Sequence, residues 1–297
     1  MLIEIEHDNQ LHTSFKSKPQ LLFVCHANGE NDAIPRVMHS HNDRLEVMFI
    51  YEGTGNYSIG GEFYSVKKGD ILVFNAGDVH DEHPLPSKDL TIYSCGIANL
   101  KINNLPLNHI ISKKRRPIIN ADKHIEQIKH FFESLIFYAT QPSLINQEII
   151  YYNMLSFLLT IHKIFNEKEQ NHSTKKITLG LRIKEFLDKY YLEQIDVESI
   201  SDALNVNRYY LSHTFKAFTG YSPKQYIIRR RLGEAQSLLL NSDYSVAQIA
   251  NKVGYSNVSN FHNIFEKVIG MSPGKYKKLW LNKEQFLSKN ESNPMNN

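Results

Sequence analysis

Hydrophobic and polar residues alternate along the first third of the chain, from about residue 21 to residue 97. The pattern is clearest in the run FIYEGTGNYSIGGEFYSVKKGDILVFNAGDVH, where Tyr57 and Ile59 belong to one period-two stretch and Phe63 and Ser65 to the next. Glycines separate these stretches at short intervals. Short strands divided by regularly spaced glycine turns are typical of antiparallel barrels and sandwiches. The sequence therefore predicts an antiparallel β domain in this part of the chain.

The hydrophobic period changes to that of a helix between Asp122 and Asn166. Two helices are predicted there, with a break near Gln141-Pro142-Ser143. Their apolar stripes consist of Ile125, Ile128, Phe132, Leu135 and Ile136 in the first helix and of Ile149, Tyr152, Leu155, Phe157, Leu158 and Ile161 in the second. Stripes of this width can cover the β domain alone or can also pair with a second copy of the chain, and the sequence leaves both arrangements open.

The chain is polar from Glu167 to Thr178 and has no hydrophobic period there, which is typical of a linker between domains. From Leu179 onward the periodicity is helical, up to a polar tail. These changes predict five segments: a β domain over residues 1–120, a helical segment over 121–166, a linker over 167–178, a helical domain over 179–283 and a polar tail over 284–297.

The helical domain contains an internal repeat. The first copy, ISDALNVNRYYLSHTFKAFTGYSPKQY, begins at Ile200, and the second, IANKVGYSNVSNFHNIFEKVIGMSPGKY, begins at Ile249. In this alignment Asn207 matches Ser256, one residue is then inserted, and Gly220 matches Gly270. An internal repeat indicates that one structural unit occurs twice.

Each copy predicts two short helices joined by a tight turn. In the first copy, a helix from Val197 to Leu204 is expected to bury Ile200, Ala203 and Leu204. Asn207 is a suitable N-cap for a second helix that buries Leu211 and Phe215 and ends at Gly220. In the second copy the corresponding features are a helix from Ser245 to Val253, a turn at Gly254, a Ser256 cap and a helix that ends at Gly270. Two such helices form a helix-turn-helix unit.

A long helix that starts at Pro223 is predicted between the two units. A rigid helix of this length can hold two reading heads about one DNA turn, ~34 Å, apart, so that both enter successive major grooves. Arg229, Arg230 and Arg231 lie on this helix. Contact with a phosphate and pairing within the protein are equally compatible with such an arginine run.

Composition adds a charge asymmetry to this picture. The hydrophobic content of 41% and the charged content of 22% are typical of a globular protein and exclude a fibrous or disordered one. The net charge is +3, but residues 175–283 hold 17 Lys and Arg against 9 Asp and Glu, and the rest of the chain holds 17 against 22. This excess of cations suggests that the C-terminal part meets a polyanion. The two isolated cysteines and the lack of an export signal or membrane segment predict a cytoplasmic protein.

From Val197 to Trp280 the sequence resembles the DNA-binding domain of the AraC family of bacterial transcription regulators, through the stretches LSHTFKAFTGYSPKQYIIRRRLGEAQSLL and YSVAQIANKVGYSNVSNFHNIFEKVIGMSPGKY. The resemblance implies that the second helix of each unit enters the major groove. It nominates for DNA contact Tyr209, Ser212, His213 and Lys216 in the first unit, and Ser259, Asn260, His262 and Asn263 in the second. Arg208, on the polar outer face of the first reading helix, and Asn257 of the second unit are further candidates for DNA contact. The sequence departs from the family at Glu266, where a lysine is usual, and at His213, where many relatives have an arginine. We therefore expect a weaker grip by the second unit, and base preferences do not transfer.

The N-terminal strands resemble a cupin-type barrel, the sensory domain of many AraC relatives. His39-Ser-His41 and Glu46 follow the first cupin motif, and His80 ends the second. These four residues are suitable ligands for zinc, manganese or iron, and alternation on a strand places His39 and His41 on the same side. The site is interpreted either as a divalent metal site or as a pocket whose polar residues hydrogen-bond an organic effector. Because regulators that resemble this chain have usually lost the metal, the sequence favours the pocket, and no cofactor is predicted.

These features together predict an α+β multidomain protein. It has an N-terminal antiparallel cupin-like barrel with a helical hairpin and a C-terminal all-α domain of two helix-turn-helix units joined by a long helix. The predicted function is sequence-specific regulation of transcription, controlled by a small-molecule effector such as a sugar. The predicted partners are double-stranded promoter DNA, the effector, a second copy of the chain in a homodimer, and RNA polymerase if the protein is an activator.

Two other functions are compatible with parts of the sequence. A cupin oxygenase or isomerase would use the same four site residues, although an enzyme would not need the DNA-binding domain. An architectural DNA binder would show little discrimination between an operator and random DNA, whereas specific regulators typically discriminate by about 10³-fold or more. The regulator is preferred, and no catalytic role is predicted.

Overall fold

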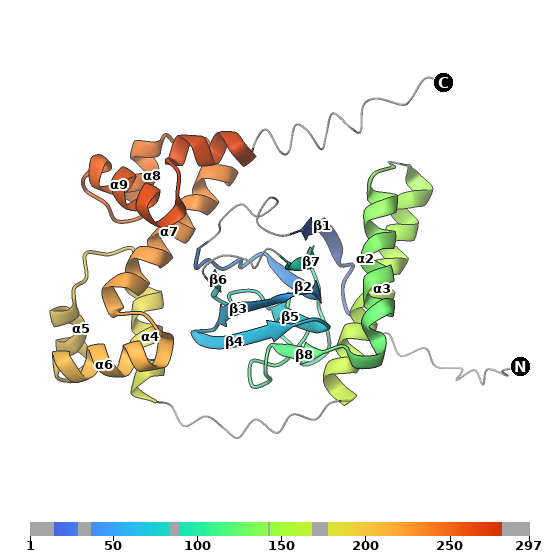
Figure 1. The fold of residues 1–297 in the computed structure, drawn as a ribbon, viewed down its shortest axis with the longest axis horizontal. Helices are drawn as coiled ribbons and strands as arrows, with labels where there is room; N and C mark the ends of the chain where they lie inside the picture. Colours follow the sequence, from blue (N-terminus) through green and yellow to red (C-terminus); the bar gives the residue numbers. More distant parts are fainter. Residues whose placement is uncertain (1–14, 29–36, 84–88, 142, 168–177, 281–297) are drawn as a thin grey trace, which may run out of the picture.

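The computed structural model describes residues 15–28, 37–83, 89–141, 143–167 and 178–280 (Figure 1). Two β-sheets lie in the middle of the molecule, with a helical hairpin on one side and the C-terminal helices on the other. The hairpin and the C-terminal helices therefore contact different parts of the β domain. The predicted boundaries of the linker (167–178) and of the polar tail (284–297) fall largely on residues that the structure does not describe, so these boundaries stay a prediction.

All strand pairs in the β domain are antiparallel, as the sequence predicts. The five-stranded sheet has the order β1-β7-β2-β5-β8, and the three-stranded sheet has the order β4-β3-β6. The strands are β1 (Gln20–Asn28), β2 (Arg44–Glu52), β3 (Thr54–Ile59), β4 (Glu62–Lys67), β5 (Asp70–Phe74), β6 (His80–His83), β7 (Thr91–Ala98) and β8 (Ile118–Asn120).

Alternation along β2 places its side chains in two different cores. Val47 and Phe49 pack with the helical hairpin, where the Phe49 ring lies parallel to that of Phe132. Met48 and Ile50 instead pack with residues of the three-stranded sheet. Because successive strand residues point to opposite faces, Glu46 shares the face of Met48, between the two sheets. The fold thus brings a carboxylate into the interior of the β domain.

The two predicted helices after the β domain are present and pack as a hairpin. A short 3-10 turn (Asp122–His124) precedes α2 (Ile125–Ala139), and α3 (Leu144–Glu167) follows. Most of the predicted stripe is buried or half-buried, but the side chain of Tyr152 is 64% exposed. Tyr152 therefore belongs to the part of the stripe that does not cover the β domain, and the pairing of this part with a second copy stays open.

The C-terminal helices form the two predicted helix-turn-helix units. They are α4 (Leu179–Tyr190), α5 (Val197–Leu204), α6 (Arg208–Thr219), α7 (Pro223–Asn241), α8 (Val246–Lys252) and α9 (Val258–Ile269), and residues 273–280 are helical as well. Phe215 of the first unit and Phe265 of the second are completely buried at equivalent positions. The 19 residues of α7 join the units, a length of about 28 Å at the rise of an α-helix.

The caps of the two reading helices correct the alignment of the repeat. The Asn207 side chain accepts hydrogen bonds from the backbone N–H groups of Tyr209 and Tyr210, as predicted. In the second unit, the cap is Asn257, which accepts from the Asn260 N–H, and not Ser256. The extra residue therefore lies in the turn before the cap, so the two helices correspond residue for residue. Both end at a glycine with positive φ, Gly220 and Gly270, as predicted.

The core of the first unit differs from the prediction at one position. Ala203 was expected to be buried but is exposed, and Ser201 on the same helix is buried.

The three arginines of α7 form contacts within the protein, which is one of the two alternatives that the sequence leaves open. Arg229 pairs with Asp81 and Arg230 with Asp188, while Arg231 donates to the carbonyl oxygens of Tyr191, Glu193 and Gly254.

Among the described residues, no helix is both long enough and apolar enough to cross a membrane.

Candidate nucleic-acid interface and metal centre

The outer face of α6 carries the residues that the sequence nominates in the first unit. Arg208, Tyr209, His213 and Lys216 are exposed, and Ser212 is half-buried. The Tyr209 side chain is 72% exposed and its ring lies 4.3 Å, centroid to centroid, from the His213 ring. Arg208 lies 3.4 Å from Glu198, but both side chains are exposed, and such pairs are weak. This face therefore offers two cations, two aromatic rings with polar ends and a hydroxyl to an approaching partner.

The outer face of α9 is polar but carries less positive charge. Ser259, Asn260 and Asn263 are exposed, whereas His262 is half-buried beside the Phe261 ring. The Asn257 side chain, also nominated, is engaged as the N-cap. Glu266 is exposed one turn after His262, so its carboxylate lies on the accessible surface of this helix.

The two reading helices have the same pattern of burial. From position 211 to 220 and from 261 to 270, the sequence of buried, half-buried and exposed residues is identical. Each helix packs through Leu or Phe at the first position, Phe at the fifth and Thr or Ile at the ninth. The repeat in the sequence thus becomes two equivalent polar surfaces, fixed to the two ends of α7.

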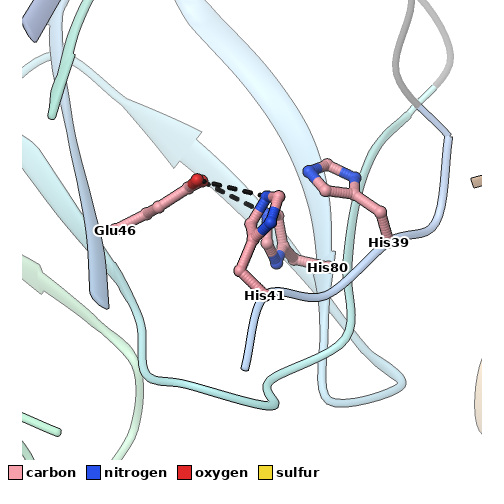
Figure 2. A group of neighbouring side chains, drawn as sticks. All are labelled: His39, His41, Glu46 and His80. Atoms are coloured by element: carbon pink, nitrogen blue, oxygen red, sulfur yellow. Dashed lines mark ion pairs between the residues drawn. The ribbon is translucent and has the colours of Figure 1, made fainter. Parts of the chain in front are cut away.

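A second candidate site lies inside the β domain, where His39, His41, Glu46 and His80 meet (Figure 2). The two histidines of the 37–41 segment and His80 of β6 are buried, and Glu46 comes from β2. One ligand atom from each residue can be chosen so that all lie within 4.8 Å of one another. The rings of His39 and His41 lie 5.0 Å apart, although the 37–41 segment that carries them is not one of the strands.

Backbone carbonyls orient two of the imidazoles. His39 Nδ1 lies 3.0 Å from the Val37 carbonyl oxygen, and His80 Nδ1 lies 2.9 Å from that of Asp78. Because a carbonyl only accepts, Nδ1 carries the hydrogen in each ring and Nε2 bears the lone pair of the neutral form. This outer hydrogen bond is the arrangement that metal-binding histidines use. The Phe74 ring stacks on His80 at 4.2 Å and restricts its orientation further.

The Glu46 carboxylate faces the histidines. Its Oε1 lies 3.2 Å from His41 Nε2 and its Oε2 lies 3.6 Å from His80 Nε2. Three imidazoles and a carboxylate suit zinc, manganese or iron, whose ligands lie about 2 Å from the ion. The donor set, the burial and the imidazole orientation therefore fit a divalent transition-metal ion. The same residues can also hydrogen-bond an organic ligand.

The structure adds site residues that the sequence did not nominate. Asp81 follows His80 directly on β6, and its side chain is completely buried. Its carboxylate meets Arg229 and Tyr221 of the C-terminal helices, 140 or more positions away in the chain. No local signal marks this contact, because an Asp on a short strand and an Arg on a helix are both common at exposed positions.

Comparisons with known proteins agree with both parts of the chain. Residues 21–143 match the family model described as an AraC-like ligand binding domain, and residues 200–279 match that of a helix-turn-helix domain. The chain is 27% identical to the uncharacterized HTH-type transcriptional regulator YdiP of Escherichia coli over 248 residues, 82% of each protein. It is 26% identical to the Msm operon regulatory protein of Streptococcus mutans over 80% of this chain and 84% of that protein. It is 23% identical to the HTH-type transcriptional activator RhaS of Escherichia coli over 78% of this chain and 84% of that protein.

Proposed function

Because the chain belongs to the AraC family of DNA-binding transcription regulators, we propose that it binds promoter DNA through α6 and α9 and changes transcription when a ligand occupies its β domain. The observation that carries this proposal is the identical burial of the two reading helices, which leaves a polar face outward on each. The protein acts on DNA in the cytoplasm and not as an enzyme. Since RhaS is named an activator, recruitment of RNA polymerase is the proposed route to regulation.

The nominated residues divide by the part of DNA that they suit. Arg208 and Lys216 are placed to contact phosphates, which position a protein without reading sequence. Tyr209 and His213 in the first unit, and Asn260 in the second, can reach base edges, where an asparagine pairs well with adenine. The Asn257 side chain caps α9, so it contributes to DNA binding by fixing the start of the reading helix and not by a direct contact. The carboxylate of Glu266 repels phosphate, so the second unit contributes less affinity than the first.

We expect His213→Ala or Tyr209→Ala to weaken binding to a selected DNA site by roughly 10- to 100-fold, because each removes a contact to a base edge worth about 1–3 kcal/mol. The site is the duplex that the wild-type protein selects from a random library, and binding is measured by fluorescence anisotropy at fixed salt. Affinity for random duplex should change much less.

The matched control is His130→Ala, which removes an exposed side chain from α2, on the far side of the β domain. It should bind both duplexes as the wild type does. An equal loss of affinity for the selected and the random duplex in the Tyr209 and His213 variants would contradict base reading by these residues.

The ligand site of the β domain is the His39, His41, Glu46 and His80 cluster, and we propose that it holds a divalent transition-metal ion. The sequence favours a pocket without metal, but the converging ligand atoms and the imidazole orientation support the ion. When bound, such an ion supplies a fixed positive charge and a coordination position for an oxygen-bearing effector. A sugar as that effector stays a prediction.

A cupin-type enzyme is the competing function for the same four residues. It predicts turnover of a small substrate after iron or manganese is added, whereas a regulator predicts a change in DNA binding. The DNA-binding part of the chain favours the regulator, because catalysis in the β domain does not require it.

The outer face of the hairpin is the proposed dimer contact. Ile145, Tyr152 and Leu159 of α3 are exposed and lie seven residues apart, so they form one stripe along the helix. Phe137 and Leu144 extend this apolar surface at the tip of the hairpin. A heptad-spaced stripe suits the same helix of a second copy, related by a twofold axis.

Replacing Tyr152 and Leu159 together by glutamate should therefore yield a monomer, because four carboxylates would face one another in the dimer. Sedimentation equilibrium measures the mass, and Lys224→Glu, which changes an exposed side chain of α7 outside the hairpin, is the control. A wild-type protein that is monomeric at all concentrations, or a variant that stays dimeric, would disprove this contact.

A further inference from the structure

The metal cluster and the contact with the C-terminal helices share two short pieces of backbone. The first is the 37–41 segment, which carries His39 and His41. Immediately before them, the Val37 N–H donates to the Gln236 side-chain oxygen of α7 at 3.0 Å. The Val37 side chain packs in the core of the second helix-turn-helix unit and that of Met38 in the core of the first.

The approach of α7 to this segment is close enough to require a glycine. A Cβ added at Gly233 would lie 2.1 Å from the Met38 carbonyl oxygen and 2.9 Å from that of Val37. These neighbours are backbone atoms, which cannot move aside as a flexible side chain can. The helix and the segment are therefore in direct backbone contact, one residue from a member of the cluster.

The second shared piece is β6, where the cluster residue His80 precedes Asp81. The Asp81 carboxylate accepts from Arg229 Nε at 2.8 Å, its Oδ2 lies 2.7 Å from Arg229 Nη2, and it accepts from the Tyr221 hydroxyl at 3.3 Å. Burial raises the pKa of Tyr221, so the hydroxyl keeps its proton and remains a donor. Separating α7 from β6 would strip a buried carboxylate of its charged partner, which is costly unless water replaces it.

The two pieces are joined to each other. The His39 N–H donates to the His80 carbonyl oxygen at 3.0 Å, and the His80 N–H donates to that of His39 at 2.9 Å. A displacement of the 37–41 segment therefore either carries His80 along, so that the three histidines move relative to Glu46, or breaks this bridge. We name the contacts of Val37, Met38 and Asp81 with Arg229, Gly233 and Gln236 the α7 clasp.

We propose that the α7 clasp couples the ligand site to the DNA-binding domain: an ion in the cluster stabilises the docking of α7 on the β domain, and docking raises the affinity for the ion. This inference rests on the proposed metal site. Its direction follows from the geometry, because the ligand atoms converge to within 4.8 Å while α7 is docked. Binding coupling is reciprocal, so either effect implies the other. When an ion occupies the cluster, α7 and the two reading helices are thereby held in a fixed position relative to the α3 stripe that is the proposed dimer contact.

The test variant is Gly233→Ala, which adds one methyl group to α7 against the Met38 carbonyl and favours the helix itself. The matched control is Gly274→Ala, also a helical glycine, where an added Cβ meets nothing within 4 Å. Titration of the metal-free full chain with Co²⁺ against a competing chelator gives the affinity. We expect Gly233→Ala to weaken Co²⁺ binding by about 10-fold, a typical coupling factor, and Gly274→Ala to leave it unchanged.

Hydrogen exchange provides the reciprocal measurement. Co²⁺ should slow exchange of the backbone amides of α7 in the wild type and in Gly274→Ala but not in Gly233→Ala. Arg229→Gln, which breaks the clasp from another contact, is the second variant if Gly233→Ala fails to fold by circular dichroism, and it should weaken Co²⁺ binding in the same way.

The outcomes separate the two proposals. A wild-type chain that binds no Co²⁺ contradicts the metal site and with it the coupling. Binding by the wild type together with unchanged affinity in Gly233→Ala and Arg229→Gln contradicts the coupling alone.

Discussion

Replacing His41 and His80 together by alanine should reduce the metal content of the purified protein from about one ion per chain to none. Structural sites in zinc-finger peptides bind zinc with roughly 10–16 kcal/mol, so the loss of two of four ligands should remove several kcal/mol, on the order of 10³-fold in affinity or more. The remaining His39 and Glu46 would form an incomplete site. The measurement is elemental analysis of protein purified without a histidine tag.

The control for this prediction is His130→Ala, which removes an exposed histidine of α2 outside the cluster. It should retain the wild-type metal content. A wild-type protein that contains no metal and takes up none from zinc, manganese or iron solutions would contradict the metal site. The organic pocket that the sequence favours would then be the better interpretation of the same four residues.

Replacing Phe265 by alanine should destabilise the second helix-turn-helix unit by about 3–5 kcal/mol, the usual cost of removing a buried phenylalanine. The ring is completely buried and packs against Phe261 at 5.6 Å and Tyr276 at 5.9 Å between centroids. Since the free energy of unfolding of a domain is typically about 5–15 kcal/mol, this change would remove a large part of it. Chemical denaturation followed by circular dichroism measures the free energy of unfolding.

The neighbouring variant Glu266→Ala changes an exposed side chain of the same helix and should shift that free energy by no more than about 0.5 kcal/mol. Phe215→Ala is the equivalent change in the first unit and should cost a similar amount, because the two residues occupy equivalent buried positions. Equal stability of Phe265→Ala and Glu266→Ala would show that the second unit does not depend on this core.

Local patterns were sufficient for the elements of the C-terminal part. The bounds of α5 and the caps at Asn207 and Gly220 could be predicted, because a cap is a hydrogen bond between residues two to four positions apart. The Ser256 cap was wrong for an equally local reason. Ser256 and Asn257 are both good caps in sequence, and only the packing of Phe261 and Phe265 decides the helix phase.

The candidate metal centre could be predicted in part. The resemblance to the two cupin motifs nominated all four residues, but the shared strand face that the spacing of His39 and His41 indicates is absent, because the 37–41 segment is not a strand. Sheet pairing and the backbone bridge between His39 and His80 place the four residues together. The carbonyl contacts that orient two of the imidazoles, which changed the preferred interpretation from a pocket to a metal site, depend on local backbone geometry that no side-chain pattern reveals.

The sequence by itself determined the two kinds of domain, the repeated helix-turn-helix unit and the polar faces on α6 and α9. Periodicity and capping depend on residues within one or two turns of each other, so they can be read along the chain. Only the tertiary structure decided that Arg229 pairs with Asp81 and that Gly233 lies against Met38. These partners are far apart in the chain, and each is unremarkable in its own segment. A contact of this kind exists only once two separately folded surfaces meet, because its free energy comes from the fit between them.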